Sequence, residues 1–289
     1  MTCKYSFLSI DQYSGIYRAF LEAFSDYAVD MSYMNESNML NRWIKNGVDF
    51  SCSVGAFHGD KIVGFTMIGI GFYKGQLSAF DAGTGIIPAF RGKGLASAMF
   101  DFAIPKLKGK EVKRFYLDVL QSNRAGIRAY EKSGFTIARR YNCYELRLTN
   151  QKFPAYDPRH IQVLPIDREL IYTFANELDW TPAWENSFFA ISGIPDDLLV
   201  LGAFRKGICI GIIIYYPAIQ WIHNILVRKE YRKQGIASRL LSYLLCEISI
   251  DTQLVKVINI QDTDVAMDKL VRKFGFSPVT GQYEMELTL

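Results

Sequence analysis

The pattern of hydrophobic and polar positions predicts two rounds of the same order of strands and helices. In the first round, residues such as Ile16, Phe20 and Phe24 recur at the spacing of a buried helix face. The predicted helices are 11–25, 35–47, the segment that follows Gly94, and 123–134. The predicted strands are 5–10, 50–57, 61–70, 77–87, 114–120 and 136–148.

The second round repeats this order after a segment, 149–160, that has two prolines and no hydrophobic period. Its predicted strands are 161–166, a hairpin over 198–216, 219–227, 255–260 and 282–289. Its predicted helices are 167–191, the segment that follows Gly235, and 265–275. We therefore place a linker at 149–160, between an N-terminal domain at 1–150 and a C-terminal domain at 160–289.

Fixed offsets between landmarks indicate that one domain was duplicated. Gly94 and Gly235 lie 141 positions apart, as do Gly134 and Gly275. Earlier in each half, "GAF" begins at Gly55 and again 147 positions later. The difference of six predicts that the first half is longer between its third and fourth strands. Each half is thus expected to be a mixed, mostly antiparallel, twisted sheet flanked by helices, an α/β (α+β) fold.

Composition narrows the class of protein. The 289 residues are 49% hydrophobic and carry a net charge of +4, which suits a folded protein and predicts no nucleic-acid partner. The five cysteines are scattered, which favours reduced thiols, and the three histidines lack metal-ligand spacing. The start lacks the pattern of a signal peptide, and the most apolar run, 208–222, is too short to cross a membrane. We expect a cytoplasmic protein without a metal or a membrane partner, either a monomer or a homodimer.

Two glycine-containing loops carry the candidate chemistry. "FRGKGLASAM" at 90–99 and "YRKQGIASRL" at 231–240 each stand between a predicted strand and a predicted helix. Such a turn exposes backbone N–H groups at a helix N-terminus, where an anion such as phosphate binds. The sequence lacks the GK[ST] of nucleotide-triphosphate loops and the full fingerprint of dinucleotide-binding folds. A basic turn that only caps a helix is the alternative.

The order strand, loop, helix, strand and then "NRAGIRAYEKSGF" resembles the GNAT superfamily of acyl-CoA-dependent N-acetyltransferases. The resemblance spans nearly the whole chain as two tandem domains. It implies that acetyl-CoA is the co-substrate, with its pantetheine arm on the strand edge at Ile86 and Ile87 and with Asn123 in contact. Backbone groups of the first loop would hold the pyrophosphate, namely those of Arg91, Gly92, Lys93, Gly94, Leu95 and Ala96. The second loop keeps the matching residues Arg232, Lys233, Gly235, Ile236 and Ala237.

Tyr130 is the general acid that the resemblance implies, because a phenol can protonate the departing thiolate. A core tyrosine is the alternative; we expect the small residues Ala125, Ala129 and Ser133 to face the core, with Tyr130 on a flank. Asp81 on the fourth strand is the candidate base for an ammonium acceptor. An exposed strand carboxylate is the alternative for Asp81, and Glu22 or Asp26 are other candidates for the base. Gly83 and Gly85 suit a bulge that starts a splay between the fourth and fifth strands.

The second half departs from the family pattern at both later positions. The offset of 141 places Val271 at the position of Tyr130 and Asp264 at that of Asn123. Valine donates no proton, although His223 on the matching strand is a possible base or a structural residue. We therefore predict that chemistry belongs to the first half. The second half is either an inactive copy that binds the cofactor or a structural partner.

The predicted function is N-acetyl transfer from acetyl-CoA to a primary amine of a small-molecule or peptide acceptor. Direct transfer is expected because no cysteine stands at an evident nucleophile position. The alternative is a non-catalytic CoA-binding or sensor protein. Aromatic residues before the fourth strand would recognise a cationic acceptor or simply form core: Tyr27, Tyr33, Trp43, Phe72 and Tyr73.

Overall fold

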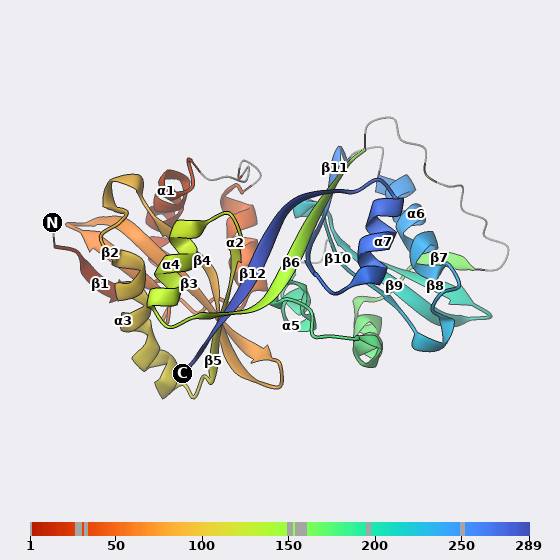
Figure 1. Ribbon diagram of the computed structural model, residues 1–289, viewed down its shortest axis with the longest axis horizontal. Coiled ribbons are helices and arrows are strands. Elements are labelled where there is room, and N and C mark those ends of the chain that lie inside the picture. The colour runs from red at the N-terminus through yellow and green to blue at the C-terminus, as the bar shows by residue number, and fades with distance from the viewer. Residues whose placement is uncertain are drawn as a thin grey trace. The chain divides into compact units, whose positions relative to one another are not determined.

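The repeated order of strands and helices folds into two units in the computed structural model (Figure 1), which describes residues 2–26, 31, 34–148, 153, 161–194, 198–248 and 252–289. Unit 1 comprises Met1–Arg139 together with Tyr283–Leu289, and unit 2 comprises Arg140–Gln282. The predicted boundaries, 1–150 and 160–289, divide the chain once, so that each domain is one continuous segment. The units of the structure differ from this division, because each unit also contains a strand segment from the other half of the sequence. Apart from Phe153, the predicted linker lies outside the described residues.

Unit 1 is a mixed, mostly antiparallel sheet with helices packed on it. Its elements are β1 (Lys4–Phe7), α1 (Tyr13–Ala23), α2 (Glu36–Lys45), β2 (Val54–His58), β3 (Lys61–Tyr73), β4 (Gln76–Ile86), α3 (Leu95–Gly109), β5 (Arg114–Leu120) and α4 (Arg124–Lys132). Strands β1 to β4 pair antiparallel in chain order, and β5 pairs parallel to β4. A parallel neighbour requires a crossover, which α3 provides.

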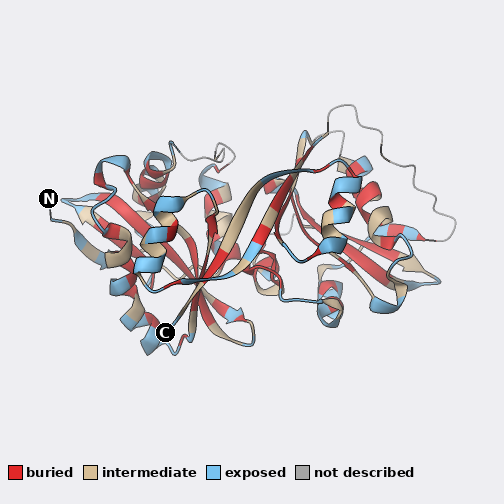
Figure 2. Cartoon of the chain, in the orientation of Figure 1, coloured by how far each residue is buried: buried red, intermediate tan, exposed pale blue. Residues whose placement is uncertain are grey.

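The core of unit 1 lies on both faces of the sheet. Every residue of β3 from Ile62 to Gly69 is buried, which requires cover on both sides of the strand. Helices α1 and α3 both pack on β3 and β4. Figure 2 shows that the buried residues concentrate in the strands and on the inner sides of the helices.

Unit 2 repeats the order. Its elements are β7 (Gln162–Pro165), η3 (Arg168–Glu177), η4 (Trp184–Asn186), α5 (Phe188–Ser192), β8 (Leu199–Arg205), β9 (Ile208–Tyr216), β10 (Trp221–Val227), α6 (Ile236–Ile248), β11 (Leu254–Gln261) and α7 (Val265–Lys273). Strands β7 to β10 pair antiparallel, and β11 pairs parallel to β10. The helices predicted over 167–191 are present but mostly of the 3₁₀ type: η3 and η4 are 3₁₀ helices, and α5 is a short α-helix. Pro182 lacks an N–H and disfavours α-helix at the residue before it, which separates these segments.

The six-residue difference between the halves lies where the sequence places it. Strand β3 has 13 residues and runs through a tight turn into β4, whereas its counterpart β9 has 9 residues. The longer β3–β4 hairpin therefore accounts for the change of offset from 147 to 141.

The final strands of the two halves are exchanged. Strand β6 (Thr136–Arg147) starts in unit 1 and continues into unit 2, where its residues from Tyr141 to Arg147 pair antiparallel with β11. Strand β12 (Ser277–Thr288) starts in unit 2 and ends in unit 1 as the neighbour of β5. The Leu289 backbone N–H donates to the Lys113 carbonyl at 3.1 Å in unit 1. Each sheet is thus completed by residues that the other half encodes.

Candidate active site

The strands β4 and β5 part at a β-bulge in unit 1. Their parallel pairing ends at Asp81 opposite Leu117, although β4 continues to Ile86. On the other side of β4, the register with β3 shifts by one residue around Ala82, and Gly83 has φ 153°. The sequence predicts that two glycines, Gly83 and Gly85, form the bulge. Gly83 lies in the bulge, whereas a side chain at Gly85 would meet the Phe65 ring at 2.6 Å, so that glycine permits close packing.

The loop after β4 presents a row of backbone donors. Within the described part of the chain, the N–H groups from Gly92 to Ser97 have no hydrogen-bond acceptor, because the first helical bond is donated by Ala98 to the Gly94 carbonyl. Gly94 lies in the left-handed region at φ 77°, and no side chain caps the helix start. A Cβ on Gly92 or Gly94 would meet nothing within 4 Å, so no other residue packs against that side of the two glycines. This geometry fits a phosphate group.

The Arg91 side chain does not face this row of donors. Its guanidinium forms two hydrogen bonds with the Asp26 carboxylate, each 2.7 Å, and two more with the carbonyls of Ala23 and Ile86. The Lys93 ammonium donates to the Ala89 carbonyl at 2.9 Å. Asp26 therefore already balances the charge of Arg91, and the side chain fastens the loop to the segment after α1.

The strand edge at Ile86 and Ile87 is partly used by the protein itself. The Ile87 N–H donates to the Val63 carbonyl at 3.0 Å, and the Ile86 carbonyl accepts from the Arg91 guanidinium. Ile87 is buried, whereas Ile86 is half-buried at the end of β4. Contact of this edge with a ligand stays a prediction.

Asp81 is buried at the bulge rather than exposed. Its side chain is 8% exposed and accepts hydrogen bonds from the Gly83 N–H at 3.0 Å, the Thr84 hydroxyl at 2.8 Å and the Thr66 hydroxyl at 3.4 Å. Burial raises the pKa of Asp81 to about 6, although the hydrogen bonds from Thr84 and Gly83 act in the opposite direction. A carboxyl with this pKa can accept a proton near neutral pH. Sequence reasoning missed these two threonines. The sequence does place a threonine on each of the two neighbouring strands, Thr66 on β3 and Thr84 three positions after Asp81 on β4, and this pattern could have indicated hydrogen-bond donors for the aspartate.

The other candidates for the base are engaged elsewhere. The Glu22 carboxylate pairs with the Lys61 ammonium at 2.9 Å on the surface, and Asp26 holds Arg91.

Tyr130 lies on α4, half-buried, with its ring against Phe100 at 5.8 Å and Phe135 at 6.1 Å between centroids. The expected inward row of small residues is wrong for Ala125, which is exposed, whereas Ala129 and Ser133 are half-buried. Ile127 is the buried residue of α4. Tyr130 follows Ile127 by three positions, which places both on the same side of the helix. The ring therefore packs in an aromatic cluster, and the acid role of its hydroxyl stays a prediction.

Asn123 caps the start of α4. Its side-chain oxygen accepts from the Gly126 N–H at 2.9 Å. Contact of Asn123 with a ligand also stays a prediction.

The aromatic residues proposed for acceptor recognition do not form one group. Trp43 and Tyr73 are buried, with 3% exposure each, whereas Phe72 is 67% exposed. Tyr27 and Tyr33 lie outside the described residues. The core alternative therefore holds for Trp43 and Tyr73.

Unit 2 reproduces the strand opening and the row of donors. The pairing of β10 with β11 ends at Ile222 opposite Val257, and the register with β9 shifts around His223. From Lys233 to Ser238, the backbone N–H groups have no acceptor within the described residues. Arg232 repeats the role of Arg91: its guanidinium binds Asp179 at 2.7 Å and the backbone carbonyl of Glu177.

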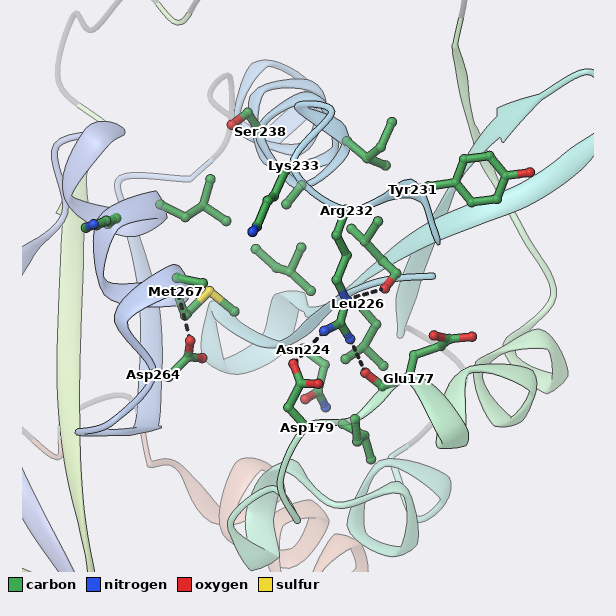
Figure 3. Close-up of a pocket in the computed structure, with 18 of the residues that line it drawn as sticks. Glu177, Asp179, Asn224, Leu226, Tyr231, Arg232, Lys233, Ser238, Asp264 and Met267 are labelled. Carbon is green, nitrogen blue, oxygen red and sulfur yellow. Dashed lines mark hydrogen bonds and ion pairs between the residues drawn. The ribbon is translucent and has the colours of Figure 1, made fainter. Parts of the chain in front are cut away.

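A cavity of about 550 Å³ lies beside this row of donors (Figure 3). Its wall includes the β10 edge from Asn224 to Val227, the loop at Lys233, and Met267 and Leu270 of α7. Asp264 caps α7 by accepting from the Met267 N–H at 2.9 Å, and burial raises its pKa. The size and the mixed lining suit a small-molecule ligand.

The part of the chain that the structure describes contains neither a metal cluster nor a membrane-spanning helix. Among the described residues, no three His, Cys, Asp or Glu side chains are grouped to hold a metal ion. In the same part of the chain, no helix is long and apolar enough to cross a membrane.

Comparison with solved structures shows the same fold over the whole length. A GCN5-related N-acetyltransferase from Sphaerobacter thermophilus is 17% identical, with a TM-score of 0.74 over 99% of this chain and 95% of that one. A tandem GNAT protein from the clavulanic acid biosynthesis pathway is 15% identical, with a TM-score of 0.73 over 99% and 98%. A GCN5-related N-acetyltransferase from Anabaena variabilis is 13% identical, with a TM-score of 0.61 over 99% and 72%. A search of curated proteins gives no match.

The sequence profile of the acetyltransferase (GNAT) family matches the chain twice, at residues 13–135 and 167–276. Each match contains one strand opening and one row of donors. Because the two matches cover most of the chain, it belongs to the acetyltransferase (GNAT) family as a tandem protein, and this membership supports an N-acetyltransferase activity in general.

Proposed function

We propose that this protein transfers an acetyl group from acetyl-CoA to a primary amine and that unit 1 carries the reaction. One observation carries the proposal: in unit 1, a buried carboxylate with a raised pKa lies where β4 and β5 part, on the strand that leads into the row of free donors. Unit 1 also has a tyrosine at the family's acid position, whereas unit 2 has Val271 there.

Acetyl-CoA, when bound, supplies the acetyl thioester. The backbone N–H groups from Gly92 to Ser97 bind its phosphate oxygens, and the helix dipole of α3 adds to their attraction. Asp81 takes a proton from the incoming ammonium, directly or through one water, which frees the nitrogen lone pair. Tyr130 donates its phenolic proton to the departing sulfur. The new carbon–nitrogen bond thus replaces the carbon–sulfur bond, and a free thiol leaves. The nitrogen of the intermediate gives its second proton to the Tyr130 phenolate, and Asp81 releases the first proton to water, so both side chains return to their starting forms.

The acceptor is a primary amine of a small molecule or a peptide. An ordinary amine is protonated at neutral pH, so a base is required before it can attack. Asp81 is suited to this task because burial keeps its pKa near 6. Its carboxylate form predominates at pH 7 and above.

The test combines ligand binding with turnover. We expect acetyl-CoA to raise the melting temperature of the full chain, because a ligand that binds only the folded state stabilises it. Thiol release from acetyl-CoA is then measured against a panel of primary amines. The proposal is overturned if no thermal shift occurs with acetyl-CoA or CoA. A shift without thiol release for any amine indicates the non-catalytic alternative.

A further inference from the structure

The cavity in unit 2 has the donors and charges to hold a phosphate-bearing ligand. The row of N–H groups from Lys233 to Ser238 lies in its wall. Lys233, Lys269 and Lys273 also line it, and within the described residues none of these lysines forms an ion pair. In Figure 3, Lys233 extends from the loop to the side away from Arg232. Three ammonium groups and a row of donors favour several anionic oxygens.

The three carboxylates in the same wall are already engaged. Asp179 pairs with Arg232 at 2.7 Å, and Glu177 lies 3.6 Å from the Arg228 guanidinium. Asp264 accepts from the Met267 N–H at the start of α7, and burial raises its pKa, which favours its neutral form. The lysines therefore dominate the charge that a ligand meets.

Much of the remaining wall is apolar and includes consecutive residues of one strand. Ile225, Leu226 and Val227 of β10 form one side, and Met267 and Leu270 of α7 form another. An arm with amide groups can lie along the free edge of β10, which has no strand neighbour beyond Ile222 on that side in the described part of the chain. Phosphates at one end and an amide-containing arm at the other describe coenzyme A.

Asn186 closes the opening at the far end of this edge. Its side-chain amide donates to the Ile258 carbonyl of β11 at 2.9 Å, and its side-chain oxygen is 2.9 Å from His223 Nδ1 at the bulge. The Asn186 carbonyl accepts from the Asn224 side chain at 2.8 Å. One residue thus bridges β10 and β11 just beyond the point where they part. Asn186 is 4% exposed and η4 holds it there.

We propose that unit 2 is a non-transferring site for free coenzyme A, whose thiol end Asn186 seals from any acceptor. The cavity wall reaches Asn224 but does not include Asn186 or Ile258, so a pantetheine arm ends against the seal. With the arm placed along β10 in this way, the sulfur comes to the Asn186 side chain, and an acetyl group on the sulfur would compete with that side chain for space. The site therefore prefers the thiol product of the reaction to the thioester substrate. The identity of the ligand rests on the proposed function; the seal does not.

The test uses a matched pair of substitutions in the full chain. Ala96→Glu and Ala237→Glu place a carboxylate at equivalent positions in the two rows of donors, 141 residues apart and both half-buried. Glutamate is favourable in the first turn of a helix but repels phosphate. Isothermal titration with CoA and with acetyl-CoA then counts the sites.

We expect two CoA sites per wild-type chain and one in each variant. In Ala96→Glu, only unit 2 remains open, and its affinity for CoA should exceed that for acetyl-CoA by about ten-fold or more, the size of one lost steric fit. Absence of CoA binding in Ala96→Glu, or equal affinity for the two ligands, overturns the proposal. Failure of the proposed function gives a different result: no thiol release by the wild-type chain, whatever unit 2 binds.

A second variant tests the seal. In the Ala96→Glu background, Asn186→Ala should bring the affinities for CoA and acetyl-CoA closer together, because it opens space beside the sulfur. Far-ultraviolet circular dichroism checks that the double variant is folded. An unchanged ratio in folded protein overturns the role of Asn186. If the double variant does not fold, the affinities of the Ala96→Glu single variant for CoA and acetyl-CoA decide whether unit 2 prefers the thiol.

Discussion

Arg139 and Glu284, 145 positions apart in the sequence, form a two-point ion pair inside unit 1. The Arg139 Nε and Nη2 atoms lie 2.9 and 2.6 Å from the two carboxylate oxygens of Glu284. The Lys74 ammonium and the Tyr73 hydroxyl complete the cluster around the carboxylate, at 2.6 and 3.0 Å. Because Glu284 is 1% exposed and lies on β12, this cluster fastens the C-terminal strand into unit 1.

Glu284→Gln should destabilise the protein by about 3 kcal/mol, because it leaves two cations beside a neutral group in a buried site. Denaturation by urea, followed by circular dichroism, measures the change. Glu286→Gln is the matched control on the same strand. Its partner Arg114 is 3.7 Å away and both side chains are about one-third exposed, so a loss below about 1 kcal/mol is expected.

The same cluster predicts a loss of stability in acid. Burial alone raises the pKa of Glu284, but the hydrogen bonds and charge of Arg139 and the charge of Lys74 outweigh it, so the pKa lies below its ordinary value of 4.5. The ionised Glu284 carboxylate therefore contributes its full stabilisation of the folded state above pH 4.5, and this stabilisation is lost as the pH falls through the folded-state pKa. Equal acid sensitivity of wild type and Glu284→Gln would contradict this assignment.

Asp81→Asn should remove the acid limb of the pH–rate profile. With a pKa of about 6, wild-type kcat/KM rises with pH and levels off above about pH 7. The variant should lose activity by about 100-fold or more at pH 8. Asp60→Asn, in the exposed turn before β3, is the control with an unchanged profile.

The pH dependence of the free energy of unfolding tests the raised pKa of Asp81 independently of activity. A buried carboxyl with a raised pKa destabilises the folded state as it ionises, so wild-type stability falls as the pH rises from about 4 to above 6. Asp81→Asn should flatten this dependence. A profile that stays as steep in the variant would show that another group titrates.

Tyr130→Phe should lower kcat by about 100-fold or more while the KM for acetyl-CoA changes little, because general acids contribute in that range. The phenylalanine ring keeps the contacts with Phe100 and Phe135, so the melting temperature should stay near that of wild type. Tyr5→Phe on β1 is the control for loss of a phenol in the same unit. Full activity in Tyr130→Phe would remove this residue from the mechanism.

Arg91→Met and Asp26→Asn should both weaken CoA binding, because either change releases the loop that presents the row of donors. A direct attraction of Arg91 to phosphate predicts the opposite for Asp26→Asn, since removal of a negative charge would then strengthen binding. Isothermal titration of the two variants separates these roles. The double variant should resemble each single variant, because both changes break the same contact.

The sequence alone determined the duplicated order of elements, the two rows of donors and the place of the six-residue difference. Each of these depends on residues close together in the chain, such as the glycine before a helix or an apolar row at helical spacing. Strand β5 was predicted with its observed bounds for this reason. The asymmetry between Tyr130 and Val271 is likewise a matter of counting positions.

Only the tertiary structure decided which strands complete which sheet and which side chains share a site. The ends of β6 and β12 have similar alternating patterns, so local pattern fits either strand to either sheet. Contacts between residues that are distant in the sequence, such as Arg139 with Glu284, decide which sheet each strand joins. The burial of Asp81, the pairing of Arg91 with Asp26 and the bridge made by Asn186 have the same origin. Each depends on solvent exclusion and hydrogen-bond partners that neighbouring strands bring together, and no spacing in the sequence encodes them.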